Sequence, residues 1–169
     1  MSGQRADIKV VLGPRTAEHV RIYWEKTQDE EIRKRIPLQD ISLEEALRQF
    51  EASRQPDATS FGMCIGADGD YVGDVWCYGI DEAEEEMAMF SFLIFEKRLW
   101  GKGVGSQAAR LFCQEVFSRY AIRRLGAFAY AENVCSLRAL EKAGFREKER
   151  FLEEGQLSVY MEWRKPPAD

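Results

Sequence analysis

The spacing of apolar residues in the first third of the chain predicts one strand followed by helices. Ile8–Leu12 is an apolar run that Gly13-Pro14 interrupts, which is typical of a short strand. Thr16 has the position and chemistry of a helix N-cap, and apolar residues follow it at helical spacing. A short helix is predicted over Asp29–Arg35, and Ser42 begins another with a capping-box spacing.

The middle of the chain has the pattern of strands. Ser60–Ile65 and Tyr71–Ile80 flank the sequence "GADGD", which predicts a hairpin. An acidic run, "DEAEEE", precedes Met87–Phe95, which is almost continuously apolar. A strand without polar alternation is expected to be covered on both faces.

The last third alternates between helical and strand patterns. Apolar residues from Val104 onward lie on one helix face, Arg124–Tyr130 is a predicted strand, and Val134–Ala143 is a predicted helix that Gly144 ends. Two strands around Glu154-Gly155 close the chain. We expect one α/β domain over residues 1–169, with its core at about 7–165. It should contain a mixed, mostly antiparallel sheet with helices on both faces.

Composition narrows the class of protein. The 169 residues are 45% hydrophobic and 31% charged, which suits a globular domain with a substantial core. A net charge of −5 disfavours nucleic acid as a partner, and no apolar run approaches the length of a membrane span. "MSGQRADIKV" lacks a signal-peptide core, so we expect a cytoplasmic protein without a membrane partner. The four cysteines form no CxxC pair and there is one histidine, so no metal site is expected and the thiols should be reduced.

The stretch "WGKGVGS" lies between the apolar strand and the start of a helix. A helix N-terminus presents unpaired N–H groups, and glycine lets a phosphate approach them without a Cβ in the way. The stretch therefore indicates an anion cradle, with Lys102 adding charge. Its spacing fits neither the phosphate loop of nucleotide triphosphatases nor the dinucleotide fingerprint. The alternative is a tight turn that binds no ligand.

A second stretch, "AENVCSLRALEKAGF", follows about thirty residues later. Together with the glycines it resembles the GNAT superfamily of N-acetyltransferases, which use acetyl-coenzyme A. Within that superfamily it looks most like the ribosomal-protein-type N-terminal acetyltransferases. The matching residues of the second stretch are Asn133, Ser136, Arg138, Glu141, Lys142, Gly144 and Phe145.

The resemblance implies that Met87–Phe95 splays away from Arg124–Tyr130 and that acetyl-CoA, as co-substrate, enters the gap. Its pantetheine arm would bond the backbone of Leu93, Ile94 and Phe95 like an added strand. Asn133 and Ser136 would contact the pantetheine or phosphate end. The pyrophosphate would lie on the N–H groups of Trp100, Gly101, Lys102, Gly103, Val104, Gly105 and Ser106.

The sequence departs from the family pattern at three positions. Trp100 opens the glycine loop where relatives usually have Gln or Arg. Leu140 stands where many relatives carry a Tyr that protonates the departing thiolate. The first strand ends in Leu12-Gly13 instead of Leu-Arg. A thiol has a pKa of only about 8.5, so a thiolate can leave without a dedicated acid.

Acyl transfer needs a donor for the developing oxyanion and a group that takes the amine proton. The backbone N–H of Leu93 is our candidate oxyanion donor. Tyr130 is a candidate acid or a site-lining residue, with aromatic core packing as the alternative. Glu86, at the end of the acidic run, is a candidate base, with a solvated acidic loop as the alternative.

The predicted function is transfer of an acetyl group from acetyl-CoA to a primary amine. The acceptor would be a protein N-terminus, an aminoglycoside or a polyamine-like molecule, and the acidic run favours a cationic one. Two alternatives stay open: a module that binds acyl-CoA as a sensor or scaffold without turnover, and a nucleotide-binding protein of another fold. Pairing of edge strands would also allow a homodimer.

Overall fold

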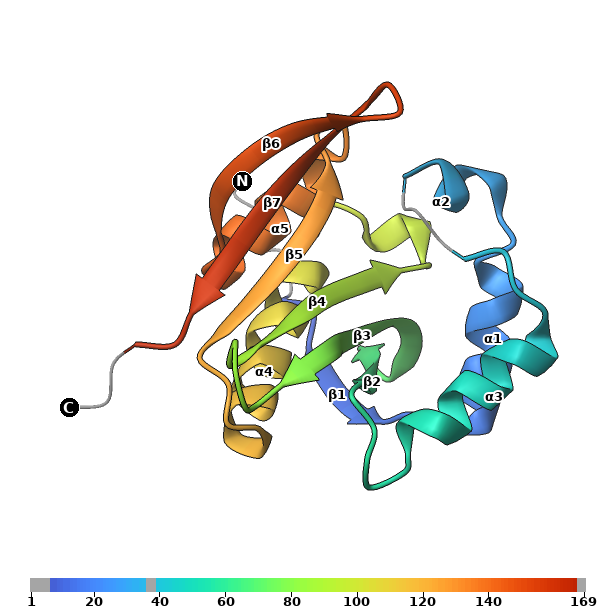
Figure 1. Cartoon of the computed structure of the whole chain (residues 1–169). Coiled ribbons are helices and arrows are strands. Elements are labelled where there is room, and N and C mark those ends of the chain that lie inside the picture. Colours follow the sequence, from blue (N-terminus) through green and yellow to red (C-terminus); the bar gives the residue numbers. More distant parts are fainter. Residues whose placement is uncertain (1–6, 36–38, 167–169) are drawn as a thin grey trace.

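The computed structural model describes residues 7–35 and 39–166, and a seven-stranded sheet with the strand order β1-β2-β3-β4-β5-β7-β6 organises the fold (Figure 1). The strands are β1 (Val10–Pro14), β2 (Phe61–Ala67), β3 (Asp70–Asp81), β4 (Met87–Ile94), β5 (Arg124–Tyr130), β6 (Arg146–Glu153) and β7 (Gln156–Arg164). The helices are α1 (Ala17–Lys26), α2 (Glu30–Arg35), α3 (Leu43–Ser53), α4 (Val104–Arg119) and α5 (Val134–Ala143), with a 3₁₀ turn, η1, at Lys97–Leu99. In the part of the chain described, no helix is both long and apolar enough to cross a membrane.

The one parallel pair of the sheet, β4 with β5, is also its shortest. These strands pair only over Met87–Met89, whereas all other neighbours are antiparallel. Beyond Met89 the two strands diverge, and Figure 1 shows β4 and β5 pointing in different directions at their C-terminal ends. The sheet therefore opens in its centre, and backbone groups on that side of β4 lose their strand partner.

Helices cover both faces of the sheet, and β4 shows why its sequence is apolar throughout. Phe90 packs against Phe112 of α4, with ring centroids 5.9 Å apart, and against Phe145, 5.3 Å away. Leu93 belongs to a separate buried cluster with Ile32 of α2. Successive β4 side chains thus enter two apolar layers, which confirms the expected strand with both faces covered.

The predicted α/β fold is confirmed, and so are several element boundaries. β5 and α5 match their predicted ranges, Gly144 is left-handed at φ +116°, and Thr16 and Ser42 cap α1 and α3. The first strand was placed two residues too early. Its ladder with β2 continues through Gly13 and Pro14, because an edge strand tolerates proline on its unpaired side.

Candidate active site

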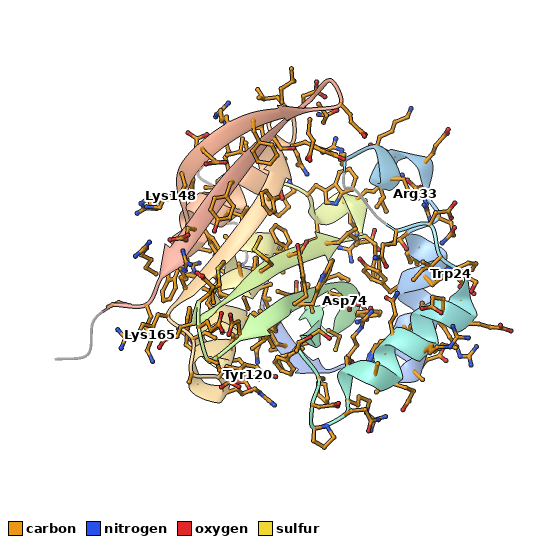
Figure 2. All side chains as sticks on the ribbon, in the orientation of Figure 1. Trp24, Arg33, Asp74, Tyr120, Lys148 and Lys165 are labelled. Atoms are coloured by element: carbon orange, nitrogen blue, oxygen red, sulfur yellow. The ribbon has the colours of Figure 1, made fainter. Side chains whose placement is uncertain are left out.

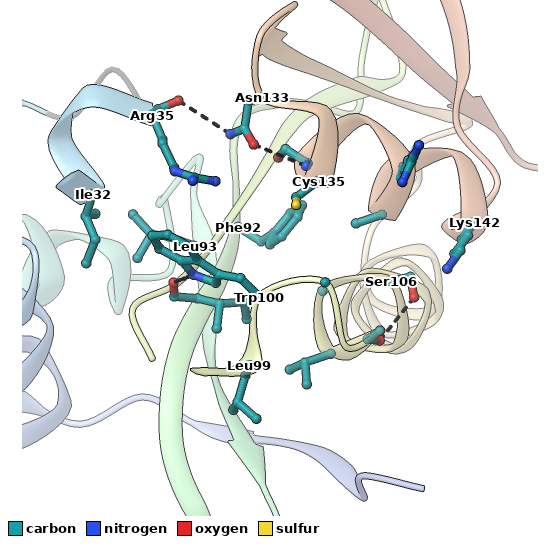
Figure 3. Close-up of a pocket in the computed structure, with 18 residues that line it drawn as sticks. Ile32, Arg35, Phe92, Leu93, Leu99, Trp100, Ser106, Asn133, Cys135 and Lys142 are labelled. Atoms are coloured by element: carbon teal, nitrogen blue, oxygen red, sulfur yellow. Dashed lines mark hydrogen bonds between the residues drawn. The ribbon is translucent and has the colours of Figure 1, made fainter. Parts of the chain in front are cut away.

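A cavity of about 180 Å³ lies where β4 leaves β5, and we call it the loop cavity (Figure 3). Its walls come from the end of β4, the glycine loop, the first turns of α4 and α5, and α2. It is lined by Ile32, Arg35, Phe92, Leu93, Ile94, Leu99, Trp100, Gly101, Gly103, Val104, Gly105, Ser106, Asn133, Cys135, Ser136, Arg138, Ala139 and Lys142. Most of the residues predicted to bind the cofactor are therefore brought together, whereas Phe95 and Lys102 do not line it.

The three glycines of the loop serve two different purposes. Gly101 and Gly103 have φ values of +75° and +87°, and a Cβ on either would meet no atom within 4 Å. They permit a left-handed backbone and leave open space beside it. A Cβ on Gly105, by contrast, would lie 2.8 Å from the Phe92 ring, so this glycine lets α4 pack closely on β4.

Some backbone N–H groups of the glycine loop already donate to backbone carbonyls, whereas others are free to bind a ligand. Those of Trp100 and Lys102 already donate to the carbonyls of Lys97 and Leu99. Those of the first turn of α4, from Val104 onward, have no carbonyl partner within the helix. The phosphate contacts predicted for Trp100 and Lys102 through their backbones are thus not supported, while the helix N-terminus suits an anion.

The register of β4 decides which of its backbone groups face the opening. The N–H of Phe95 donates to the carbonyl of Val72, and Leu93 pairs with Asp74 in the same register. Because antiparallel bonding alternates, the Leu93 N–H also points to β3, whereas those of Phe92 and Ile94 point away from it, toward the opening. The choice of Leu93 as oxyanion donor therefore does not fit the register.

Trp100 forms part of the cavity wall. Its indole Nε1 donates to the carbonyl of Ile94 at 2.8 Å, and the Arg35 guanidinium lies over its ring at 4.4 Å. Because the Ile94 carbonyl accepts from Trp100, it is not available to a ligand that enters between β4 and β5. The indole also fixes the glycine loop to the end of β4.

The opposite wall is the start of α5. The Asn133 side chain caps the helix by accepting from the Ser136 N–H at 3.3 Å, and its amide donates to the Arg35 carbonyl at 3.4 Å (Figure 3). Asn133 is thus the N-cap of α5, and the same residue joins α5 to α2. Arg138 and Lys142, one and two turns further along, add positive charge to the cavity.

A larger groove of about 1130 Å³ lies between the helices α1 and α3 and the β6–β7 hairpin, and we call it the aromatic groove. Its aromatic lining residues are Tyr23, Trp24, Phe50, Phe61, Trp76, Tyr78, Phe90, Phe128, Tyr130 and Phe151. Ser91 of β4 lines this groove, and the next residue, Phe92, lines the loop cavity, so the two spaces meet along β4.

The charges of the aromatic groove are balanced. Arg15 and Arg33 contribute positive charge, and Glu149 and Glu153 of β6 contribute negative charge. Figure 2 shows Arg33 and Trp24 on the helical side of the molecule. None of the residues of the acidic run, 81–86, which favoured a cationic acceptor, contributes to this lining.

The acidic run before β4 is a structural loop. Asp81 accepts from the N–H groups of Ala83, Glu84 and Glu85, which lowers the pKa of its carboxyl. Glu86 pairs with Arg123 at 2.9 Å and lines neither the loop cavity nor the groove. This arrangement does not support Glu86 as the base, whereas Tyr130 does lie in the groove.

A polar cluster on the β3 side of the groove was missed by the sequence analysis. Asp74, only 1% exposed, accepts from the Tyr71 hydroxyl at 2.6 Å, and one of its oxygens lies 2.9 Å from the Arg15 Nε. Burial raises the pKa of the Asp74 carboxyl, although Arg15 and Tyr71 counteract this effect. The signal in the sequence was an acidic residue within an otherwise apolar strand.

Tyr23 of α1 completes the cluster. Its hydroxyl oxygen is buried and has no hydrogen-bond partner among the described residues. Arg15 lies over its ring at 5.6 Å, and Trp76 packs against it at 6.2 Å. Burial raises the pKa of this phenol, with the Asp74 charge acting in the same direction, so Tyr23 keeps its proton.

The position of the usual family acid is a core position in this chain. Leu140 is only 2% exposed and packs in the main apolar cluster. Among the described residues, no group of three or more His, Cys, Asp or Glu side chains could hold a metal ion.

The model of the acetyltransferase (GNAT) domain family matches residues 9–146, which is most of the chain. This chain belongs to the GNAT acetyltransferase family. It is accordingly an acyltransferase, and the predicted superfamily is confirmed, while the ribosomal-protein-type subgroup stays a prediction.

Related sequences and structures agree with the family. The chain is 30% identical to an N-acetyltransferase 9-like protein of Caenorhabditis briggsae, over 82% of this chain and 75% of that protein. It is also 30% identical to the probable N-acetyltransferase YjcK of Bacillus subtilis, over 52% of this chain and 48% of that one.

Two solved structures share the fold of this GNAT chain. Spermidine N-acetyltransferase from Vibrio cholerae, in complex with CoA and spermine, has a TM-score of 0.79 at 16% identity and covers 92% of this chain and 95% of its own. An aminoglycoside acetyltransferase in complex with coenzyme A and kanamycin has a TM-score of 0.76 at 18% identity, with the same coverage. At these identities the likeness concerns the fold.

Proposed function

We propose that this protein transfers an acetyl group from acetyl-CoA to a primary amine, with the loop cavity holding the co-substrate and the aromatic groove holding the amine. The observation that carries the proposal is the junction of the two spaces at Ser91 and Phe92 of β4. A thioester that ends at this point meets an acceptor that approaches from the groove. Such alignment of two reactants is a major source of rate enhancement.

The lining of the loop cavity offers several groups that suit the phosphates of coenzyme A. The open space beside Gly101 and Gly103 and the first turn of α4 suit the pyrophosphate. Arg138 and Lys142 offer further positive charge for phosphates. We assign these residues, with the N-terminus of α5 at Asn133 and Ser136, to the co-substrate.

The free edge of β4 suits the pantetheine arm, whose amides can add to a strand. Phe92 and Ile94 present N–H groups on this edge, while the Ile94 carbonyl is already bonded by Trp100. The arm would therefore bond the carbonyl of Phe92 and one of these two N–H groups. We assign the oxyanion donor to the other N–H group, in place of that of Leu93.

In the reaction the amine nitrogen attacks the thioester carbonyl carbon, the C–S bond breaks, and the sulfur leaves as a thiolate. An N–H of β4 stabilises the oxygen as it gains charge, and one such donor contributes about 2.7–4 kcal/mol. The amine must first lose its proton, and Tyr130 lines the groove as the candidate for this transfer or for protonating the thiolate. Loss of a dedicated acid at Leu140 is tolerable because thiols are fairly acidic.

Release of free thiol tests this function. The protein is incubated with acetyl-CoA and, separately, phenylalaninamide, spermidine or kanamycin, and thiol formation is followed with a chromogenic disulfide. We expect amine-dependent release with at least one acceptor and a matching acetylated product by mass spectrometry. Binding of acetyl-CoA without turnover on any amine would instead support the sensor or scaffold alternative.

A further inference from the structure

We propose that the aromatic groove beside Ser91 also holds the acyl chain of the donor, so that this protein transfers straight-chain acyl groups longer than acetyl and prefers butyryl-CoA and hexanoyl-CoA to acetyl-CoA. This inference rests on the proposed function and specifies its donor class. The bonds exchanged are the same for every donor. The amine nitrogen bonds to the acyl carbon, the C–S bond breaks, and the proton that the nitrogen loses ends on the departing thiolate.

The thioester has one substituent that can enter the groove. In the proposed complex its sulfur leads back to the pantetheine arm in the loop cavity, and its oxygen faces an N–H group of β4. The remaining substituent of the carbonyl carbon is the acyl chain, and the two spaces meet at Ser91 and Phe92. The chain therefore continues into the aromatic groove, where the amine also lies.

Ser91 leaves a gap in the row of side chains that β4 directs to this face of the sheet. Alternation along the strand places Met89, Ser91 and Leu93 on one face. Leu93 is only 1% exposed, and a Cβ built on Gly126 would lie 3.1 Å from the Met89 Sδ and 2.6 Å from the Tyr160 hydroxyl. The positions on either side of Ser91 are thus filled, whereas Ser91 itself is small and partly exposed. A chain that leaves the junction passes over this residue.

The strands that line the groove beyond Ser91 present an uncharged surface, which we call the groove floor. Trp76 is the partner of Ser91 in the register of β3 with β4, and it packs against Tyr23 with ring centroids 6.2 Å apart. The other floor residues, from β2, β3, β4, β5 and β7, are Phe61, Gly62, Cys77, Tyr78, Phe90, Phe128, Tyr130 and Ser158. The charged lining residues come from outside these strands and are Arg15, Arg33, Glu149 and Glu153. A hydrocarbon chain can therefore lie on the floor without covering a charge.

The groove has room for the chain and the acceptor together. Its volume of about 1130 Å³ exceeds the range of about 300–1,000 Å³ that is usual for the pocket of one drug-sized ligand. Figure 1 shows the helices α1 and α3 on one side of the groove and the β6–β7 hairpin on the other. An acetyl group and a small amine would leave much of the aromatic surface between them in contact with water, and a longer chain would cover it.

A series of donors tests the proposal. Acetyl-, propionyl-, butyryl- and hexanoyl-CoA are compared by thiol release, with whichever of phenylalaninamide, spermidine and kanamycin reacts fastest with acetyl-CoA. We expect KM for the donor to fall about fourfold with each added methylene at least as far as butyryl-CoA, which is the fold-change for burial of about 0.8 kcal/mol per CH₂. Mass spectrometry should find the corresponding acylated amine.

Two variants locate the chain. Ser91→Leu fills the gap and should remove the advantage of butyryl- and hexanoyl-CoA over acetyl-CoA. Ser91→Ala removes the hydroxyl without adding volume and should keep the fourfold step. Ser118→Leu makes the same change on an exposed residue of α4 outside both spaces, and should also keep it. A rise in Tm with acetyl-CoA shows that Ser91→Leu is folded and binds its donor, and if it is not, the wild-type series decides alone.

Two outcomes would overturn the proposal. In the first, KM for the wild type does not fall from acetyl- to butyryl-CoA, or only acetylated product forms. In the second, the step survives in a folded Ser91→Leu, which would place the chain elsewhere. If no donor turns over with any amine, the proposed function fails, and the same four donors are titrated calorimetrically into the wild type and Ser91→Leu. Equal affinities for all donors in the wild type, or the same gain per methylene in both proteins, would then contradict an acyl chain beside Ser91.

Discussion

The loop cavity and the aromatic groove meet along β4 but are built in opposite ways. The cavity is made largely of backbone: left-handed glycines, a helix N-terminus and an unpaired strand edge. The groove is made of side chains from α1, α2, α3 and most strands of the sheet. Backbone recognition suits the co-substrate that we propose for the cavity, whereas recognition by side chains can be adapted to one acceptor.

The largest effect should come from the groove side, where Asp74 is buried against Arg15. Asp74→Ala leaves Arg15 and the Tyr71 hydroxyl without their partner, so the free energy of unfolding should fall by about 3 kcal/mol. Urea denaturation measures this change, and acetyl-CoA should still stabilise the variant. Asp70→Ala, on an exposed residue of the same strand, should stay within about 0.5 kcal/mol. Equal losses in both variants would contradict a structural role for Asp74.

The next effect belongs to the cavity side. Gly105→Val places a side chain against the Phe92 ring, which should cost about 2 kcal/mol of stability and remove the stabilisation by acetyl-CoA. Gly69→Val is the matched control, because Gly69 has φ +91° in the β2–β3 turn and lies outside both spaces. It should destabilise the protein but keep the response to acetyl-CoA. A normal response in Gly105→Val would show that the close packing of α4 on β4 is not needed for binding.

A smaller effect separates capping from binding at α5. Asn133→Ala should lower the free energy of unfolding by about 1 kcal/mol, as loss of an N-cap does, and should also weaken acetyl-CoA binding. Ser42→Ala removes the corresponding cap of α3 and should cost a similar amount without changing the affinity. Calorimetric titration with acetyl-CoA compares the two variants. Unchanged affinity in Asn133→Ala would restrict this residue to a structural role.

The smallest expected effect is a pH dependence of the stability that arises at the buried Asp74 beside the groove. Burial raises the pKa of the Asp74 carboxyl, so the folded protein holds this proton more tightly than the unfolded chain does. The contribution of the Asp74 carboxyl to the free energy of unfolding is therefore largest below the ordinary pKa of aspartate, about 4. This contribution is lost as the pH rises from there through the raised pKa of the folded state. Unfolding of the wild type relative to Asp74→Asn, measured in urea from pH 4 to 8, should show this loss. If the free energy of unfolding of the wild type, relative to that of Asp74→Asn, increased with pH, a raised pKa for Asp74 would be contradicted.

The difference between the two spaces also explains what the sequence could reveal. The strand Arg124–Tyr130 and the helix Val134–Ala143 were predicted to the residue because apolar periodicity, Asn133 and Gly144 mark their limits locally. The glycine loop was recognisable because its residues are contiguous. Its hydrogen bonding was not, since the engagement of the Trp100 and Lys102 N–H groups depends on the 3₁₀ turn before them.

The groove could not be predicted in the same way because its residues are far apart in sequence. Arg15, Tyr23 and Asp74 meet only when α1 packs on β3, and Tyr23 by itself reads as one apolar position of a helix. The oxyanion donor was misassigned for a related reason. Which N–H groups of β4 face the opening is set by its register with β3, and a shift of one residue exchanges them.

Thermal unfolding with and without acetyl-CoA tests the central claim most directly, because the whole account depends on the loop cavity holding this molecule. At about 100 times its Kd, a ligand that binds only the folded state adds about 2.7 kcal/mol of stability. We predict a clear rise in Tm with acetyl-CoA and none with NAD or ATP at the same concentration. An unchanged Tm with acetyl-CoA, or an equal rise with ATP, would contradict the assignment of the cavity.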